Sequence, residues 1–512
     1  MPGVMAATLF AAMLLAAPGA QPEPPPKAAP AEALQTFEEQ ATARLAKARA
    51  GRCPEARADL LNLVKAEGFE RLDELLRRNV LLVVLACSWK SDDPDTLLAA
   101  RKLEPLADTK QEFGLVHYHL MRFELRKGGD RRAAAWHLIE VLDNRPQLVR
   151  DWDARWFGSM LIAAQDDPDL EMAVLGRMVE IDWQTVSARN AANTRWRISL
   201  AQLQITRGTP ATLRDNLEQV SDPGSLVSVA LDRRFESVWP ELEAAGRFDW
   251  KTLAEADLAA KRKAFASEPN RLEHAMYLMD ALRRAGASEE AEAIGRAAKA
   301  RLATPDAFVD QEENAAWLLL SLIDTLEDQG RWDEVDALFR EVMPVSDRSG
   351  DRISQRVNWS DHLIAAGRPA EALKLLEEIG DDVGSPYGNA WRDSGMVCAL
   401  ADSDRQRAQA LLDRMSPGWD SNPAAVQEAH LCLGQIDEAA AMMVKRLESP
   451  KHRNGAIGAN LKGASGKTPR LPHAARLKAA RDQVYARPEV VKALARYSRP
   501  VVVPYLGDYA EP

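Results

Sequence analysis

Along most of this chain, apolar residues recur at every third or fourth position, in segments about 12–18 residues long that clusters of Gly, Pro or Asp interrupt. Such a segment buries one face of a helix and leaves the other face in water. Only Pro500 to Tyr505, with the sequence PVVVPY, has the character of a strand. The pattern therefore predicts an all-α chain of short antiparallel helices that ends in a short extended segment.

A recurring turn joins the helices that we expect to pair. In the clearest example, Gly367 ends one helix, and Glu371 and Ala372 lie in the first turn of the next. Similar turns begin at Gly51, Gly286, Gly330 and Gly434. Glycine tolerates the left-handed conformation that ends a helix, and an acidic residue is favoured at a helix N-terminus. Because alanine is small, we expect Ala372 to lie where two helices cross.

These units resemble tetratricopeptide repeats, which are helix-turn-helix units of about 34 residues. The best copy is 114–146, with Tyr118 on its first helix, Gly129 at the turn and Pro146 at its end. A second copy is 316–344. Further copies centre on Ala291, Ala372, Ala408 and Ala439, and the prolines expected near the ends of these C-terminal units are Pro305, Pro344, Pro386, Pro417 and Pro450. The resemblance implies an α-solenoid in which the first helix of each pair lines a concave face.

The chain divides into six expected regions. These are a signal peptide at 1–20, a Pro-rich linker at 21–32, N-terminal helical repeats at 33–150, irregular helical hairpins at 151–270, tetratricopeptide-like repeats at 271–450 and a basic C-terminal segment at 451–512. Within the irregular region, we interpret 231–240 as one helix that carries Phe235 and Trp239 to the core. In the C-terminal segment, 451–472 is expected to be a loop, followed by helices at 474–485 and 488–497.

The N-terminus has the features of a secretory signal. Val4 to Ala17 is apolar but too short to span a membrane, and small residues follow it, as signal peptidase requires. The alternative is a disordered Ala-rich leader. The rest of the chain contains no apolar segment long enough to span a membrane. We therefore expect an exported protein, periplasmic or secreted, without a transmembrane span.

Charge is distributed unevenly. Residues 445–499 carry a net charge of +11, whereas residues 1–444 carry −19. The basic segment could fold back along its own repeats, or it could bind an anionic envelope surface. Nucleic acid is not an expected partner, because the protein is expected to be exported and the segment lacks interleaved aromatic residues for stacking on bases.

The four cysteines form two pairs in the sequence, Cys53 with Cys87 and Cys398 with Cys432, each separated by 34 residues. Disulfides persist outside the cytosol, so a bridge within each pair is possible, and four buried thiols are the alternative. We favour the second bridge less, because neighbouring first helices are expected about 10 Å apart, whereas a bridge needs a Cα separation of about 4.4–6.8 Å.

Motifs that carry chemistry are missing. GASGKT at 463–468 lacks the first glycine of a phosphate-binding loop, since Leu461 stands there. His117 and His119 would point to different sides of a helix, and neither HExxH nor GxSxG occurs. We therefore predict no catalytic, cofactor or metal site, and a protein that is not an enzyme.

The function that fits these features is a scaffold that binds another polypeptide on a concave, largely acidic face. Its candidate residues, on the expected first helices, are Asp280, Arg283, Arg284, Trp317, Asp324, Glu327, Asp328, Asp361 and Asp393. One alternative is an enzyme or accessory domain of cell-envelope polysaccharide metabolism. Another is a structural spacer.

Export predicts removal of the apolar leader between Ala17 and Gln21. N-terminal sequencing of the protein recovered from its producing cell should therefore begin within a few residues of Gln21. Mature protein that still begins at Met1 would contradict the prediction.

Overall fold

The computed structural model describes residues 31–49, 53–88, 93–126, 128–149, 154–164, 167–181, 191–207, 213–349, 351–381, 383–463 and 471–503. Apart from two three-residue strands, the regular structure of these residues is helical, which confirms the all-α prediction. The expected signal peptide and most of the linker lie outside the described residues. The chain forms two compact units, Met1–Leu148 and Val149–Pro512.

The first unit consists of three successive helix pairs. Its elements are α1 (Ala31–Arg49), α2 (Cys53–Lys65), η1 (Phe69–Arg71), α3 (Glu74–Cys87), α4 (Pro94–Leu103), η2 (Glu104–Leu106), α5 (Lys110–Glu124), α6 (Arg131–Asn144) and η3 (Pro146–Leu148). Consecutive helices pack on one another, and residues of α1 to α5 share one apolar core. Thr109 and Glu112 form a reciprocal capping box at the start of α5, which explains why that helix begins there.

The helix pair expected at 114–146 is present as α5 and α6, and Tyr118 is buried between them. The expected role of Gly129 is only partly right. Gly128 takes the left-handed conformation, with φ of 86°. A Cβ atom on Gly129 would lie 2.2 Å from the carbonyl oxygen of Glu124, so this position needs glycine for space.

The second unit begins with short, irregular helices. They are α7 (Ala154–Ala164), α8 (Pro168–Glu180), α9 (Ala191–Thr206), α10 (Leu213–Glu218), α11 (Pro223–Leu231), η5 (Arg233–Phe235), α12 (Trp239–Ala244) and α13 (Trp250–Ser267). The prediction of one helix over 231–240 is wrong. The chain leaves the helix at Asp232, whose buried carboxylate accepts hydrogen bonds from Arg234. Phe235 and Trp239 are nevertheless both buried.

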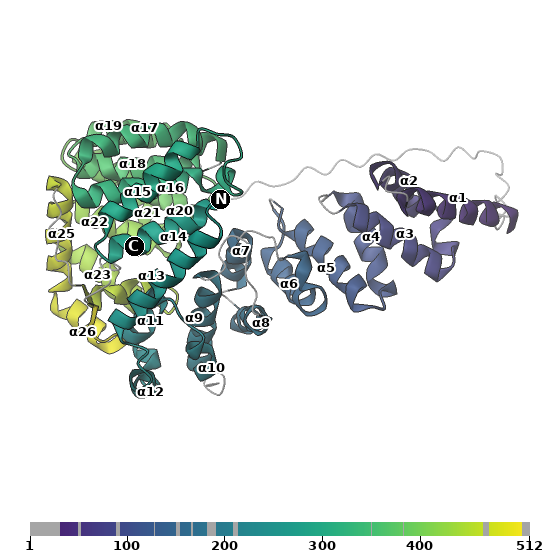
Figure 1. Ribbon diagram of the computed structural model, residues 1–512, viewed down its shortest axis with the longest axis horizontal. Helices are drawn as coiled ribbons and strands as arrows, with labels where there is room; N and C mark the ends of the chain where they lie inside the picture. Colours follow the sequence, from purple (N-terminus) through teal and green to yellow (C-terminus); the bar gives the residue numbers. More distant parts are fainter. Residues whose placement is uncertain are drawn as a thin grey trace, which may run out of the picture. The chain divides into compact units, whose positions relative to one another are not determined.

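Five helix pairs follow. They are α14 (Leu272–Arg284) with α15 (Ser288–Arg301), α16 (Gln311–Gln329) with α17 (Trp332–Ser349), α18 (Arg352–Ala365) with α19 (Pro369–Glu377), α20 (Pro386–Leu400) with α21 (Arg405–Met415), and α22 (Pro423–Cys432) with α23 (Ile436–Glu448); η6 (Ser416–Ser421) precedes α22. Neighbouring helices pack consecutively, as Figure 1 shows. We call α14, α16, α18, α20 and α22 the first helices and their partners the second helices.

The turn motif read from the sequence behaves as expected. Gly367 has a φ of 76°, and the N–H of the following Arg368 donates to the carbonyl oxygen of Leu363. The same left-handed glycine occurs at Gly286, Gly330 and Gly434. Ala372 is fully buried, as are its counterparts Ala291, Val335, Ala408 and Ala439. This position is therefore part of the core of each pair, as alanine in four pairs and as valine in one.

Two of the prolines do not end a unit as expected. α17 continues through Pro344 to Ser349, and Pro386 occupies the first turn of α20 rather than the end of α19. Proline lacks an N–H group, and that group has no partner within the first turn of a helix, so Pro386 is well suited to begin one. Proline therefore marks a helix boundary without indicating which side of it the helix lies on.

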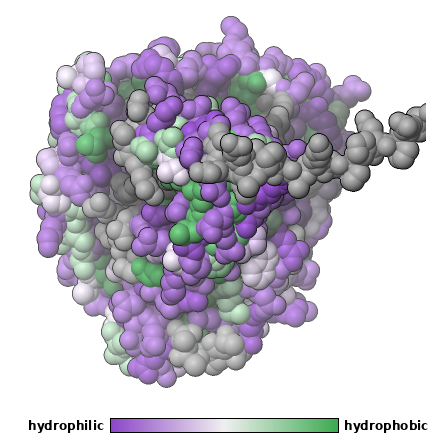
Figure 2. Space-filling model, turned by 90° about the vertical axis from the view of Figure 1, so that its right-hand side faces the viewer, coloured by the Kyte–Doolittle hydropathy of each residue, from purple (hydrophilic) through white to green (hydrophobic). Residues whose placement is uncertain are grey.

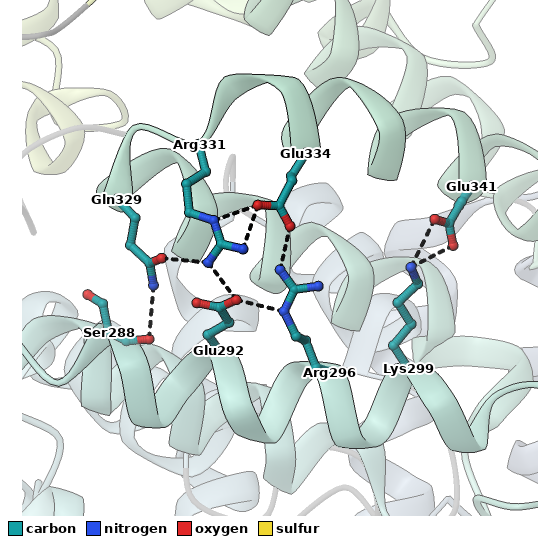
Figure 3. A network of polar contacts seen from close by, with 8 residues as sticks. All are labelled: Ser288, Glu292, Arg296, Lys299, Gln329, Arg331, Glu334 and Glu341. Carbon is teal, nitrogen blue, oxygen red and sulfur yellow. Dashed lines mark hydrogen bonds and ion pairs between the residues drawn. The ribbon is translucent and has the colours of Figure 1, made fainter.

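An ion-pair network joins the second helices α15 and α17 (Figure 3). Arg296 reaches from α15 to Glu334 at 2.6 Å, and Arg331 reaches back to Glu292 at 2.6 Å. Arg368 repeats this arrangement one unit later by pairing with Asp336 of α17. Exposed pairs contribute only about 0.2–1 kcal/mol each. We therefore infer that the network chiefly fixes the register between neighbouring repeat units and contributes little to stability.

The described part of the basic C-terminal segment, residues 451–463 and 471–503, is folded. It contains α24 (Arg453–Ile457), η7 (Gly458–Asn460), β1 (Leu461–Gly463), α25 (Pro472–Tyr485), α26 (Pro488–Tyr497) and β2 (Val501–Val503). The expected loop at 451–472 is thus wrong for its described part, since it includes α24 and β1. β2 pairs in parallel with β1, with Val501 opposite Leu461. These strands are too short for an alternating pattern to reveal both of them.

The segment docks on the second unit at two places that are distant in sequence. Leu494 and Val503 are buried in one cluster with Met443 of α23 and Val227 of α11. The N–H of Arg499 donates to the carbonyl oxygen of Leu231 at 2.9 Å. The tail therefore covers the last repeat and connects it to α11.

Both cysteine pairs are bridged, and no described cysteine is free. The Cα atoms of Cys398 and Cys432 lie 5.0 Å apart, so the expected 10 Å separation is wrong for this pair. Small buried residues on the facing helices, among them Ala399 and Ala429, allow the chains to approach closely.

Hydrophilic residues dominate the face drawn in Figure 2, where hydrophobic residues form small separate areas. Among the described residues, no helix combines the length and apolar character needed to cross a bilayer.

Because α26 is docked on the repeats, substitutions at its positions 491 and 494 should change the free energy of unfolding by different amounts. Leu494→Ala removes a buried side chain and should lower the free energy of unfolding by about 2–5 kcal/mol. Val491→Ala, at a position 51% exposed, should change it by less than about 0.5 kcal/mol. Denaturant unfolding of both variants measures the difference, and equal effects would contradict the docked position of α26.

Candidate functional site

Most of the predicted binding residues lie on two neighbouring first helices, α14 and α16. Arg283 of α14 bridges to α16, with 3.2 Å to the Asp324 carboxylate and 2.9 Å to that of Asp328. Arg284 pairs with Asp280 on α14 itself. The acidic residues of this group are therefore partly neutralised within the protein. We call Asp280, Arg283, Arg284, Asp324 and Asp328 the α14–α16 cluster.

The charges of the cluster influence one another. Partial desolvation by the neighbouring protein raises the pKa of Asp324 to about 6, although its side chain is 42% exposed and the nearby Arg283 guanidinium opposes the shift. On the same helix, Glu327 accepts a hydrogen bond from Nδ1 of His362 in α18, at 2.8 Å. Trp317 is half-buried near the other end of α16. The structure therefore does not bring Trp317 and the charged cluster together at one end of the helix.

Asp393 does not belong to an exposed face, contrary to expectation. Its side chain is 9% exposed and pairs with Arg392 at 2.7 Å and with Arg414 of α21 at 3.1 Å. Asp393 therefore faces α21, the second helix of its own pair. Trp391 and Ser394, which lie next to it on α20, instead line a cavity. The prediction placed every polar residue of the first helices on one exposed surface. It was wrong for Asp393, because polar side chains can also form ion pairs between the two helices of one unit.

A cavity of about 470 Å³ lies between three first helices and the basic tail. The walls come from α18, α20 and α22, and α25 closes one side. The lining residues are Val357, Asn358, Asp361, Ile364, Ala365, Trp391, Ser394, Gly395, Cys398, Glu428, His473, Ala474, Leu477, Lys478 and Arg481. Of the nine predicted residues, only Asp361 reaches this cavity. Its volume is within the usual range of small-ligand sites, about 300–1,000 Å³.

Two carboxylates face the cavity and differ in their surroundings. Glu428 pairs with Arg481 of α25 at 3.3 Å. Asp361 is exposed to the water of the cavity, although the nearby walls displace part of its hydration shell. That desolvation, together with the nearby Glu428 charge, raises the pKa of Asp361 to about 8. The cavity therefore holds a carboxyl group that is mostly protonated at neutral pH.

α25 is held over the first helices by ion pairs. Besides the Arg481–Glu428 pair, Arg476 contacts Asp402 at 2.8 Å and donates to Nδ1 of His473 at 2.7 Å. Burial and the Arg476 charge lower the pKa of His473, so the imidazole is neutral. The basic tail thus supplies both the closing wall and part of the charge of the site.

Sequence reasoning missed the contribution of α25 to the site. The excess of positive charge in 445–499 identified the segment but not the side chains that face the cavity, which are those of His473, Lys478 and Arg481. The periodicity of α25 contains no signal for its partner helices. Among the described residues, we also find no group of His, Cys, Asp and Glu arranged to hold a metal ion.

Comparison with known proteins adds little. No protein-family model matches the chain, and no curated protein matches it. Among solved structures, the chain is similar to a circular tandem repeat protein with novel repeat topology and enhanced subunit contact surfaces. The identity is 14%, the match covers 90% of this chain and 98% of that chain, and the TM-score is 0.14. The conclusions about this protein therefore rest on its own contacts.

The raised pKa of Asp361 predicts how stability depends on pH. Between the unfolded value near 4 and the folded value near 8, the folded state binds more protons, so stability falls as pH rises through this range. Asp361→Asn removes this dependence. Urea unfolding midpoints of the wild type should therefore fall more steeply between pH 5 and about pH 9 than those of the variant. Parallel pH profiles would contradict the shift.

Proposed function

We propose that this protein is an exported helical-repeat scaffold that binds a basic segment of another polypeptide on the first-helix side of its second unit. We further propose that the repeats are degenerate tetratricopeptide-like units. Binding rather than catalysis fits a site that is built from ion pairs and a cavity. The pairing of all four cysteines supports export, because disulfides persist in oxidising compartments.

One observation carries the proposal: the first-helix side already holds a basic polypeptide segment. α25 places Arg481 on Glu428 of α22, and Arg476 on Asp402, which follows α20. A helix held by arginine–carboxylate contacts supports the proposal that this surface accommodates basic polypeptide segments. The α14–α16 cluster lies on the same set of helices. Asp324 and Asp328 carry carboxylates there that α25 does not engage.

The binding mode that we propose is electrostatic. A lysine-rich segment would add positive charge beside Asp324 and Asp328, which share one arginine, Arg283. Such contacts stabilise a complex modestly and make it sensitive to salt. A single partner segment can extend over several first helices, because helical repeats present a continuous surface.

The proposal predicts that loss of two cluster charges weakens binding. The double variant Asp324→Asn/Asp328→Asn keeps the acceptor oxygens that face Arg283 but removes two negative charges. At about 0.2–1 kcal/mol for each charge, affinity for a lysine-rich peptide should fall roughly 2- to 30-fold. Fluorescence anisotropy of a labelled peptide measures this change.

Glu290→Gln/Glu334→Gln is the matched control, because it removes the same charge from the second helices α15 and α17. It should leave the affinity unchanged. Equal weakening by both double variants would show that only net charge matters and would contradict a site on the first helices. A glutamate-rich peptide that binds as tightly as the lysine-rich one would contradict the proposed class of partner.

A further inference from the structure

Asp361 is the charged residue of the cavity wall that lacks a counter-charge. Of the other charged residues there, Glu428 and Arg481 pair with each other at 3.3 Å, and Lys478 pairs with Asp482 at 3.0 Å. Among the described residues, no hydrogen bond or ion pair reaches the Asp361 carboxylate, and its nearest electrostatic influence is another acid, Glu428. A carboxyl group in this setting provides a place for a cation.

The remaining wall suits a cation that carries an apolar stem. Trp391 from α20, Ile364 from α18 and Leu477 from α25 line the same cavity. An indole face attracts ammonium groups, and aliphatic side chains favour methylene groups over water. An anion would find a poor match, because Arg481 and Lys478 already hold carboxylates.

Two further polar groups of the wall have no partner within the described part of the chain. Ser394 is 1% exposed and His473 is 8% exposed, and both residues line the cavity. The Oγ atom of Ser394 and the Nε2 atom of His473 form no hydrogen bond. Since Nδ1 of His473 accepts from Arg476, the neutral ring carries its proton on Nε2. The wall therefore contains a hydroxyl group and an N–H group that have no partner among the described residues, and both atoms are shielded from solvent.

We propose that the cavity binds an aliphatic ammonium group, which the polypeptide partner presents either as a lysine side chain or as its N-terminal α-amine. The inference rests on the proposed function and names the group that the cavity recognises. The ammonium pairs with Asp361, its methylene or backbone stem lies along Trp391 and Leu477, and His473 Nε2–H is a donor for a carbonyl oxygen. A cavity of about 470 Å³ has room for one side chain and its flanking backbone.

Calorimetric titration of the mature, disulfide-bonded protein with three small probes tests the proposal. N-acetyl-lysine methylamide carries the side-chain amine, and alaninamide carries the α-amine. N-acetyl-norleucine methylamide has the lysine stem without its charge. One of the two amines should bind at least about tenfold more tightly than the norleucine compound, and which amine does so identifies the source of the ammonium. Equal affinity for the norleucine compound and both amines, or no binding of either amine, would overturn the proposal.

Variants connect the binding to the assigned wall. Asp361→Asn should weaken amine binding at least about tenfold, whereas Asp333→Asn, at an exposed site on α17, should not change it. Trp391→Leu is a second test, because it removes the indole that contacts the ligand but keeps the Asp361 carboxyl group. It should also weaken amine binding. Unchanged affinity in both Asp361→Asn and Trp391→Leu would overturn the assignment.

Proton release gives a readout that a merely structural role would not produce. Because the pKa of Asp361 is about 8, most of this carboxyl is protonated at neutral pH, and ammonium binding must ionise it. The other titratable or charged groups that line the cavity are Glu428, Lys478, Arg481 and the neutral His473. Calorimetry in two buffers of different ionisation enthalpy should show release of most of one proton per amine in the wild type and none in Asp361→Asn. Absence of proton release in the wild type would count against Asp361 as the partner.

The two proposals can fail separately. Asp324→Asn/Asp328→Asn tests the α14–α16 cluster with a long peptide, whereas the small amines test only the cavity. Peptide binding without amine binding would overturn the cavity proposal alone. Amine binding with a peptide affinity that is insensitive to the cluster would overturn the first-helix site alone.

Discussion

Burial of the apolar face of the last repeat by the C-terminal segment is the constraint on which the second unit depends. A stack of helix pairs leaves an uncovered apolar surface at each end, and that surface must be capped for the protein to remain soluble. Leu494 and Val503 cover α23 and at the same time contact Val227 of α11. The cap therefore also connects the last repeat to the irregular helices that precede the repeats. The position of α25 follows from it, because α25 directly precedes α26 in the chain.

Charge works together with this apolar contact. Part of the positive charge in the tail is matched by carboxylates elsewhere in the second unit, as in the pairs Arg481–Glu428 and Arg499–Glu243. Such partly exposed pairs contribute little energy individually, so the apolar cluster provides most of the stabilisation. The ion pairs instead select the orientation of α25 over the first helices. The uneven charge along the sequence thus helps to orient the basic C-terminal segment on the acidic part of the same molecule.

The cavity is a consequence of this arrangement. α20 packs closely on the preceding pair at Gly395, where a Cβ atom would lie 3.0 Å from the side chain of Leu376 and 3.7 Å from that of Ser360. α25 crosses above α18 and α22 and does not fill the space over α20. Asp361 faces that space without a counter-charge, and partial desolvation together with the nearby Glu428 charge raises its pKa. A site of this kind can distinguish ligands by charge, because pairing with a cation removes the cost of ionising the carboxyl group.

The sequence alone determined the helix pairs, because their signals are local. The turn between two paired helices is marked by residues that are close in sequence: a left-handed glycine, an acid in the first turn of the next helix, and a small residue such as Ala372. The hydrophobic period of a helix is likewise visible within a few residues. Only the tertiary structure decided the rest. The close approach of Cys398 to Cys432, the inward position of Asp393 and the docking of the tail on α11 depend on how separate helices cross. Local periodicity shows which face of a helix is buried but does not specify the partner, since any apolar surface of suitable shape satisfies it.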